Sequence, residues 1–193
     1  MNLAIFPGTF NPLHIGHLMI AESALQEFKL DKIHFILSPN PPHKVKDLID
    51  VKHRKEILEV GIANNKKFTL DLREINRQGL SFTIDTVKEF KEENKIKNKL
   101  GMILGLDSFL TVESWQGSKE LAQECKFFIA PRSGWDITDI EDSFPSFYHE
   151  LEWHMIDSPM LPVSSSLIRQ RKRNNQSYRY LLSDLCFEIY EKI

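Results

Sequence analysis

Short apolar runs alternate with amphipathic stretches along most of this 193-residue chain. Runs of this length, bounded by Gly, Pro or polar residues, are typical of buried strands. The stretches between them repeat apolar residues at helical spacing, as Leu18, Ala21 and Leu25 do. The pattern predicts strands near residues 3–6, 33–37, 68–72, 100–106 and 126–130, and helices near 15–28, 52–64, 83–93, 118–123, 164–173 and 178–193.

The order of these elements predicts the fold class. Strands that alternate with helices imply right-handed βαβ crossovers, so we expect an α/β Rossmann-like fold with a mainly parallel sheet flanked by helices. Because no repeat or clear linker occurs, one domain is expected over residues 1–193, with a helical C-terminal part over 163–193. Residues 134–150 show little periodicity and are expected to form a loop or a short helical excursion. The closing helix is expected to turn four apolar residues inward, namely Leu181, Leu182, Leu185 and Ile189.

Composition narrows the class of protein. A net charge of −2 argues against a general nucleic-acid binder, which would carry a clear excess of basic residues. Cys125 and Cys186 show no CxxC spacing, so neither a disulfide framework nor a zinc site is expected. No basic leader precedes an apolar segment, and the apolar runs are far too short to span a bilayer. We therefore expect a cytoplasmic enzyme that binds neither membranes nor nucleic acids.

The sharpest motif is the segment 8–17, GTFNPLHIGH, between the first expected strand and the first expected helix. Free N–H groups and the helix dipole favour an anion at such a turn. Gly8 permits a tight turn, and Gly16 permits a nucleotide to lie close to the backbone. His14 and His17 are three residues apart and can donate hydrogen bonds to the same phosphate, more strongly when protonated. A shared metal ion ranks lower, because no carboxylate or cysteine lies close in sequence.

A second candidate is the segment 163–169, VSSSLIR. Serines before a helix cap its N–H groups, and others of these groups stay free for a phosphate. Arg169 can reach the same phosphate with its two-pronged guanidinium. The alternative is a capped surface helix, and the following basic residues are expected to be a solvated face, namely Arg171, Lys172 and Arg173.

Both segments resemble motifs of the nucleotidyltransferase superfamily. Segment 8–17 is similar to the HxGH form of its signature, and segment 163–169 is similar to its ISSTxIR element. The resemblance implies adenylyl transfer, with His14, His17 and Arg169 stabilising the reacting phosphates. It also implies ATP contacts from a further set of residues, namely Gly8, Thr9, Phe10, Gly16 and Ser165.

Three inner segments resemble elements of bacterial nicotinate-mononucleotide adenylyltransferases: PPHK at 41–44, SFTIDT at 81–86, and ILGLDS at 103–108 followed by a tryptophan. The resemblance implies that Lys44 stabilises charge at the mouth of the site. It further implies a nicotinate site at Ser81, Phe82, Thr83 and Trp115, and ribose contacts from Gly105 and Asp107. Two positions depart from the family pattern, since Phe82 replaces the usual Tyr and Gln116 a frequent aromatic residue. A last group at family positions is expected to be salt-linked scaffold, namely Arg54, Asp71, Glu74 and Arg77.

The reaction that this resemblance implies joins the AMP part of ATP to nicotinate mononucleotide. Mg²⁺ is the expected cofactor, bound mainly through ATP phosphates, so no protein metal ligands are predicted. Two alternatives stay open: a related transferase using nicotinamide mononucleotide or phosphopantetheine, and a nucleotide sensor without turnover. Pro7 is shared with the pantetheine-phosphate branch, although that branch usually has Thr at the position of His14. A homo-oligomer is also left open.

Overall fold

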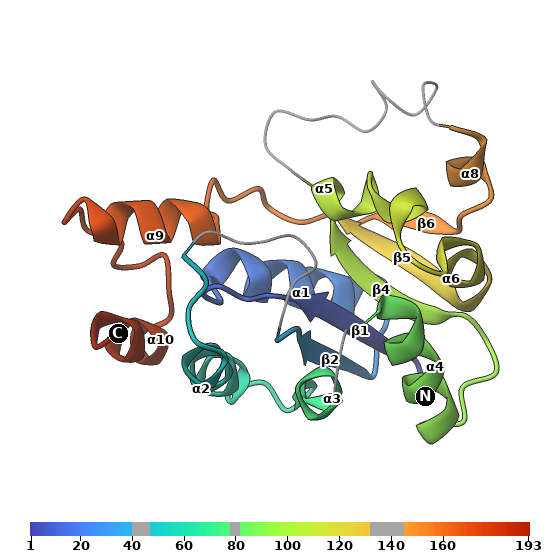
Figure 1. The fold of residues 1–193 in the computed structure, drawn as a ribbon, viewed down its shortest axis with the longest axis horizontal. Coiled ribbons are helices and arrows are strands. Elements are labelled where there is room, and N and C mark those ends of the chain that lie inside the picture. Colours follow the sequence, from blue (N-terminus) through green and yellow to red (C-terminus); the bar gives the residue numbers. More distant parts are fainter. Residues whose placement is uncertain (40–46, 78–81, 132–144) are drawn as a thin grey trace.

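A single parallel sheet forms the centre of the computed structural model, which describes residues 1–39, 47–77, 82–131 and 145–193. All strand pairs among these residues are parallel, and the order is β3-β2-β1-β4-β5-β6 (Figure 1). The strands are β1 Leu3–Gly8, β2 Lys32–Leu37, β3 Phe68–Asp71, β4 Leu100–Gly105, β5 Cys125–Ala130 and β6 Trp153–Met155. The predicted fold class is confirmed.

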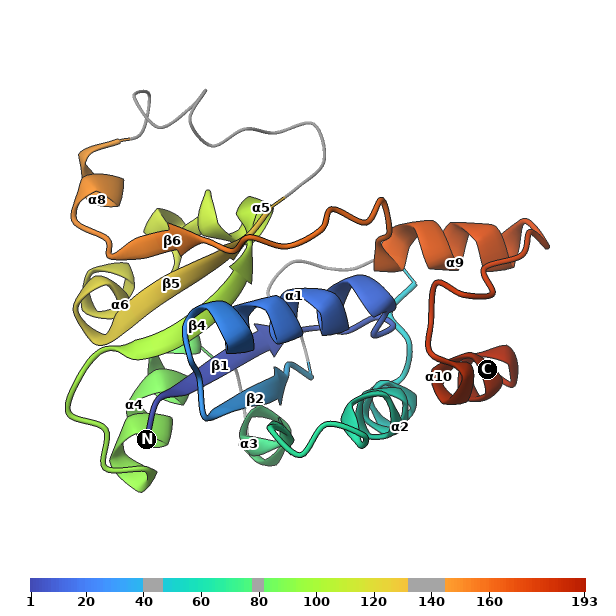
Figure 2. The same cartoon turned by 180° about the vertical axis from the view of Figure 1, so that it is seen from behind.

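Helices cover both faces of this sheet. The helix α1 lies on the face turned to the viewer in Figure 2, and α4 lies on the face turned to the viewer in Figure 1. The longer helices are α1 Ile15–Glu27, α2 Val51–Ile62, α4 Thr83–Glu93, α6 Ser118–Glu124, α9 Ser165–Arg173 and α10 Asp184–Glu191. Shorter turns are α3 Arg73–Asn76, α5 Leu106–Phe109, the 3₁₀ turn η1 Val112–Ser114 and α8 Ser146–His149.

Alternate residues of β1 enter two separate hydrophobic cores. Ala4 and Phe6 pack on the side of α1, α2 and the C-terminal helices, whereas Leu3 and Ile5 pack on the side of α4 and α6. Successive side chains of a strand point to opposite faces, so a strand buried on both faces must be apolar throughout. This requirement explains why β1, β4 and β5 were visible as continuous apolar runs.

The order of the strands determines where a ligand can bind. The chain fills the sheet outward from β1 in one direction with β2 and β3, and in the other with β4, β5 and β6. The switch point therefore lies between β1 and β4, whose last residues are Gly8 and Gly105. In sheets of this kind ligands bind beyond the carboxyl ends of the strands at such a point.

The closing helix differs from the prediction. It begins at Asp184 instead of residue 178, because Tyr180 has φ 69°, which an α-helix does not accept. Its buried positions are Cys186 and Tyr190, while Leu185 is 52% exposed. The expectation that Leu185 faces inward was therefore wrong. Of the other three, Leu182 is buried, and Leu181 and Ile189 pack at the edge of the core.

Two elements beyond residue 144 were not predicted as such. The helix α8 agrees with the short helical excursion expected within 134–150, of which 134–144 lie outside the described residues. The strand β6 has three residues at the edge of the sheet, too few for an apolar run. β6 pairs with β5. After β6 the segment 157–164 passes along α1 and reaches the start of α9 (Figure 2).

Candidate active site

The loop after β1 folds tightly over its own aromatic residue. Phe10 has φ 44° and is only 3% exposed, and its ring meets the edge of Phe6 at 5.5 Å between centroids. A Cβ on Gly8 would lie 2.9 Å from the Phe10 ring, so glycine is required there. Because the Phe10 side chain belongs to the core, its predicted contact with ATP can come only from the backbone.

His14 and His17 form a stacked pair at the start of α1. Their ring centroids are 3.7 Å apart with 28° between the planes. His14 occupies the N-cap position, and its backbone N–H donates to Nδ1 of His17 at 3.2 Å. Since Nδ1 of His17 accepts this bond, the neutral ring carries its proton on Nε2. His17 is thus held as an Nε2–H donor, and both predicted histidines lie at the switch point.

Burial determines the charge of this pair in the free protein. It lowers the pKa of His14 to about 4. Burial and the nearby His14 together lower the pKa of His17 well below its ordinary value. Both rings are therefore neutral at neutral pH without ligand, so in the free protein they can donate only as neutral imidazoles. A bound phosphate would favour the protonated form again, because opposite charges attract strongly in a buried site.

The C-terminal motif closes onto this loop. Ser165 Oγ donates to the carbonyl of Pro12 at 2.8 Å, and Arg169 Nη1 donates to the carbonyl of Asn11 at 2.7 Å. The expected serine cap is confirmed, since Ser164 Oγ accepts from the backbone N–H of Leu167 at 3.1 Å. The two motifs, more than 140 residues apart in sequence, thus form one structure at the end of β1.

Gly16 is the contact point between the two motifs. A Cβ at this position would lie 2.8 Å from Cγ1 of Val163. The absence of a side chain therefore allows the C-terminal motif to approach α1, in addition to any space that it leaves for a nucleotide. Gly105, at the end of β4, is different, because a Cβ there would meet no heavy atom within 4 Å. The space beside Gly105 is open, and Asp107 lies exposed in the next turn.

The basic run after Arg169 is only partly a solvated face. Arg173 is exposed as predicted, whereas the prediction was wrong for Arg171 and Lys172, which are half-buried. Arg171 Nη1 donates to the carbonyl of Ser177 at 2.8 Å. Lys172 lies 4.4 Å above the Tyr190 ring, and Arg173 forms an ion pair with Asp47. Each of these side chains ties α9 to a neighbouring segment.

Arg54 also has a different role from the salt-linked one expected of it. Its side chain is 1% exposed. Among the described residues, every hydrogen-bond acceptor of its guanidinium is a backbone carbonyl. The acceptors are Ile49 at 2.9 Å, Thr9 at 2.9 Å, Ser38 at 2.7 Å and Pro39 at 2.8 Å. Arg54 therefore fixes the loops that follow β1 and β2 relative to each other, which places Thr9 beside the site.

Of the other three scaffold residues, Arg77 and Asp71 are salt-linked as expected, and Glu74 is held by a hydrogen bond. Arg77 pairs with Glu89 at 2.5 Å, and Asp71 pairs with Arg73 at 2.7 Å. Glu74 is buried and accepts a hydrogen bond from Thr86 Oγ1 at 2.9 Å. Since Thr86 lies in the first turn of α4, this bond fixes the start of that helix.

The start of α4 has no side-chain cap among the described residues. The N-cap is Phe82, whose side chain cannot accept a hydrogen bond, and Thr83 is already helical. Ser81 and Lys44, two predicted site residues, lie outside the described residues. Within the described part of the chain, the first N–H groups of α4 therefore have no side-chain acceptor.

Trp115 and Phe82 approach the same part of the second core. Both are partly buried against it, and Trp115 Nε1 donates to Thr111 Oγ1 at 3.2 Å. Gly117, with φ 74°, brings the turn after Trp115 against α4, since a Cβ there would lie 2.8 Å from Ile84. The predicted residues Phe82 and Trp115 thus pack against the same hydrophobic core, on the side of the sheet that carries α4.

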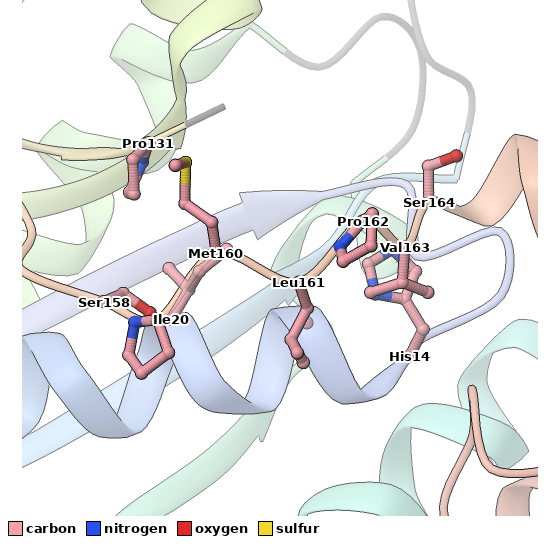
Figure 3. Close-up of a pocket in the computed structure, with 11 residues that line it drawn as sticks. His14, Ile20, Pro131, Ser158, Met160, Leu161, Pro162, Val163 and Ser164 are labelled. Atoms are coloured by element: carbon pink, nitrogen blue, oxygen red, sulfur yellow. The ribbon is translucent and has the colours of Figure 1, made fainter. Parts of the chain in front are cut away.

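A hollow of about 220 Å³ lies beside α1, and sequence analysis did not predict it. Its walls come from the start of α1, from Pro131 after β5, and from the segment 158–164 (Figure 3). Two buried polar atoms of this wall have no hydrogen-bond partner among the described residues, Nδ1 of His14 and Oγ of Ser158. The segment 158–161 has neither periodicity nor a motif, so no pattern in the sequence indicated this wall.

Comparison with known proteins identifies the family. A model of the cytidylyltransferase-like family matches residues 5–171. The probable nicotinate-nucleotide adenylyltransferase of Moorella thermoacetica is 38% identical, over 94% of this chain and 85% of its own length. That of a Thermoanaerobacter species is 37% identical, over 100% of this chain and 95% of its own. The chain belongs to the nicotinate-nucleotide adenylyltransferase family. The resemblance first indicated by the HxGH segment is confirmed.

Solved structures agree on the fold. A Plasmodium falciparum nicotinic acid mononucleotide adenylyltransferase complexed with NaAD superposes with a TM-score of 0.76, at 21% identity, over 99% of this chain and 95% of that one. The same protein complexed with APC gives a TM-score of 0.76 at 20% identity, over 99% of this chain and 94% of that one. Among the described residues, no helix is long and apolar enough to cross a membrane. No group of three or more His, Cys, Asp or Glu in this part of the chain could hold a metal ion.

The fork of Arg169 gives a first prediction for this family member. Arg169→Lys keeps the charge but cannot bond Asn11 and a phosphate at the same time, so kcat/KM should fall about tenfold or more. Arg173→Lys is the matched control, because Arg173 is 57% exposed and, among the described residues, forms an ion pair with Asp47 alone. Its kcat/KM should stay within about twofold, as expected for an exposed pair. Equal losses of kcat/KM in the two variants would contradict the phosphate-binding role of Arg169.

The buried histidine pair gives a second prediction, on stability and pH. The pKa of His14 is about 4 in the fold, below its value in the unfolded chain, so the unfolded chain binds more protons between these values. Its stabilising contribution is therefore complete above about pH 6.5 and is lost as the pH falls toward 4. Over this pH range we expect His14 to lower the free energy of unfolding by about 1–3 kcal/mol. Urea unfolding of the ligand-free protein over this range should show a smaller pH slope in His14→Asn, whereas identical slopes would contradict the burial effect.

Proposed function

We propose that this protein transfers the adenylyl group of ATP to nicotinate mononucleotide, giving deamido-NAD and pyrophosphate, a step of NAD biosynthesis. The observation that carries the proposal is the junction at the end of β1. There Ser165 and Arg169 donate hydrogen bonds to the loop that leads into the stacked pair of His14 and His17. The chain's membership of the family supports the same proposal. Two anion-binding motifs thus converge on one place, as a triphosphate requires.

ATP would lie across the switch point with its adenosine in the hollow beside α1. His14 lines this hollow and stacks on His17. The phosphates of ATP would therefore extend from the hollow toward His17 and Arg169. Backbone groups of the loop after Gly8 would add contacts, including those of Thr9 and Phe10. The open space beside Gly105 would leave room for a ribose, with Asp107 near its hydroxyls.

Nicotinate mononucleotide would bind on the other side of the switch point. Phe82 and Trp115 would pack against the pyridine ring, as their shared place on the second core supports. The start of α4, which has no side-chain cap among the described residues, would bind the carboxylate through backbone N–H groups, as the family resemblance implies for Ser81, Phe82 and Thr83. Lys44, on the loop after β2, would then reach the acceptor's phosphate.

The reaction needs alignment and charge stabilisation more than a base. The nucleophile is a phosphate oxygen of the mononucleotide, which is already ionised at neutral pH and needs no deprotonation. It would attack the α-phosphorus in line with the departing pyrophosphate. His17 would donate from Nε2–H, and Arg169 and Lys44 would stabilise the charge that develops on the phosphates.

Magnesium would enter with ATP. The described residues offer no cluster of three or more acidic, His or Cys side chains, so the ion would be held mainly by phosphate oxygens and water. When bound there, Mg²⁺ offsets negative charge on the triphosphate. His17, Arg169 and Lys44 would bind the same phosphates through their side chains.

The proposal is tested by following oxygen atoms. Nicotinate mononucleotide with ¹⁸O at the three non-bridging phosphate positions is mixed with ATP, Mg²⁺ and the protein, and products are weighed by mass spectrometry. We expect all three labels in deamido-NAD, none in pyrophosphate, and no pyrophosphate without acceptor. Pyrophosphate without dinucleotide would indicate a hydrolase, and no product at all would favour a sensor. Phosphopantetheine and nicotinamide mononucleotide serve as competing acceptors in the same assay.

A further inference from the structure

Ser158 has a buried hydroxyl that forms no hydrogen bond within the described part of the chain. Its side chain is 7% exposed, and Oγ has no hydrogen-bond partner among the described residues. Buried polar groups are nearly always paired, so an unpaired one calls for a reason. Ser158 lines the hollow beside α1, and this hollow is where its missing partner would lie.

The surroundings of Ser158 are otherwise apolar. Ile20, Pro131 and Leu161 form walls of the same hollow. The other serine of the lining, Ser164, already accepts the N–H of Leu167 as the cap of α9. Within the described lining, Ser158 is therefore the hydroxyl that is free to bond a ligand. Mainly apolar walls with a few polar groups are typical of a site for a planar, partly polar ring.

The distance along α1 places this hydroxyl at the base end of a nucleotide. Figure 3 shows Ser158 beside Ile20 at one end of the hollow and His14 at the other. His14 and Ile20 are six residues apart, which is about 9 Å along a helix. A nucleotide whose phosphates contact the histidine pair would therefore extend its base toward Ser158.

We propose that the Ser158 hydroxyl binds the adenine ring of ATP by accepting a hydrogen bond from its 6-amino group. The inference rests on the proposed function, because it takes the hollow as the adenosine site. A hydroxyl oxygen can accept such a bond, and the amino group is the donor that adenine presents. Ser158 is thereby a specificity-determining residue, for which the fold gives up a hydrogen bond in the free protein.

The test compares ATP with purine riboside triphosphate, which lacks only the 6-amino group. The dissociation constant of each nucleotide is measured by calorimetry without acceptor. The KM of each nucleotide is measured with nicotinate mononucleotide as the acceptor. The free protein should bind ATP about three- to tenfold more tightly than the analogue, as one neutral hydrogen bond would give. In Ser158→Ala that ratio should fall to about one, through weaker ATP binding and with kcat nearly unchanged.

Stability separates this role from a structural one. Removing an unpaired buried hydroxyl should leave the Tm of the ligand-free protein equal or higher, because no bond is lost. Ser114→Ala is the control, since its exposed hydroxyl donates to the carbonyl of Thr111 at 2.7 Å, away from the hollow. It should keep the ratio for the two nucleotides. An unchanged ratio in Ser158→Ala, or equal weakening of both nucleotides with a lower Tm, would overturn the inference. Absence of turnover in the unsubstituted protein would instead refute the proposed function, while the two binding constants would still decide the role of Ser158.

Discussion

Replacing His17 with Asn should lower kcat about 100-fold or more while the protein stays folded. The Asn amide oxygen can take the position of Nδ1 and keep the bond from the His14 N–H, which is 3.2 Å long with His17. The variant lacks the Nε2–H group, which is the one expected to donate to the reacting phosphates. Loss of one positioned donor of this kind typically costs 10²–10³-fold in turnover.

Steady-state release of pyrophosphate measures this effect, and urea unfolding verifies the fold. His149→Asn is the matched control, because His149 is exposed on α8 and has no part in the site. It should retain normal turnover. A well-folded His17→Asn protein with nearly normal turnover would show that His17 does not act on the phosphates.

The sheet was predictable because of how its strands are buried. Strands such as β4 and β5 have apolar neighbours on both faces, so each appears in the sequence as an uninterrupted apolar run. The edge strand β6 has only three residues, of which His154 is exposed, and it left no such run. Local pattern therefore identified the interior of the sheet and missed its edge.

Tertiary partners explain the errors in the C-terminal part. The left-handed Tyr180 interrupts what looked like one long helix, and no local pattern indicates that conformation for a tyrosine. The basic run after Arg169 looked solvated because the contacts of its side chains with other segments leave no local pattern. Arg173, for example, pairs with Asp47, 126 residues away.

The meeting of the two motifs was predictable from the sequence, whereas the bonds and charges within them were not. The motifs correctly indicated that the loop 8–17 and the segment 163–169 meet, but not that Arg169 binds a backbone carbonyl of that loop. The charge of His14 depends on burial, which a sequence does not show. The roles of Lys44 and Ser81 stay predictions, because both lie outside the described residues.

The acceptor should be the acid, with a preference of at least about tenfold in kcat/KM over the amide. The first turn of α4 has no side-chain cap among the described residues, and the bond from Thr86 to Glu74 fixes it in place. A carboxylate there gains about 0.3–1 kcal/mol from the helix dipole and charge-assisted hydrogen bonds. The amide would turn its NH₂ donors toward N–H donors, which leaves buried polar groups unpaired at roughly 1–3 kcal/mol. The sum is about 1.3–4 kcal/mol, which matches or exceeds the 1.4 kcal/mol that a tenfold ratio requires.

The kcat/KM values for nicotinate mononucleotide and nicotinamide mononucleotide, at one fixed concentration of ATP and Mg²⁺, test this account most directly. Phe82→Tyr is the control, because both acceptors share the pyridine ring and both values should change together. The account predicts that the acid exceeds the amide by at least about tenfold in the unsubstituted protein and in the control. Equal values for the two acceptors, or a higher value for the amide, would contradict it.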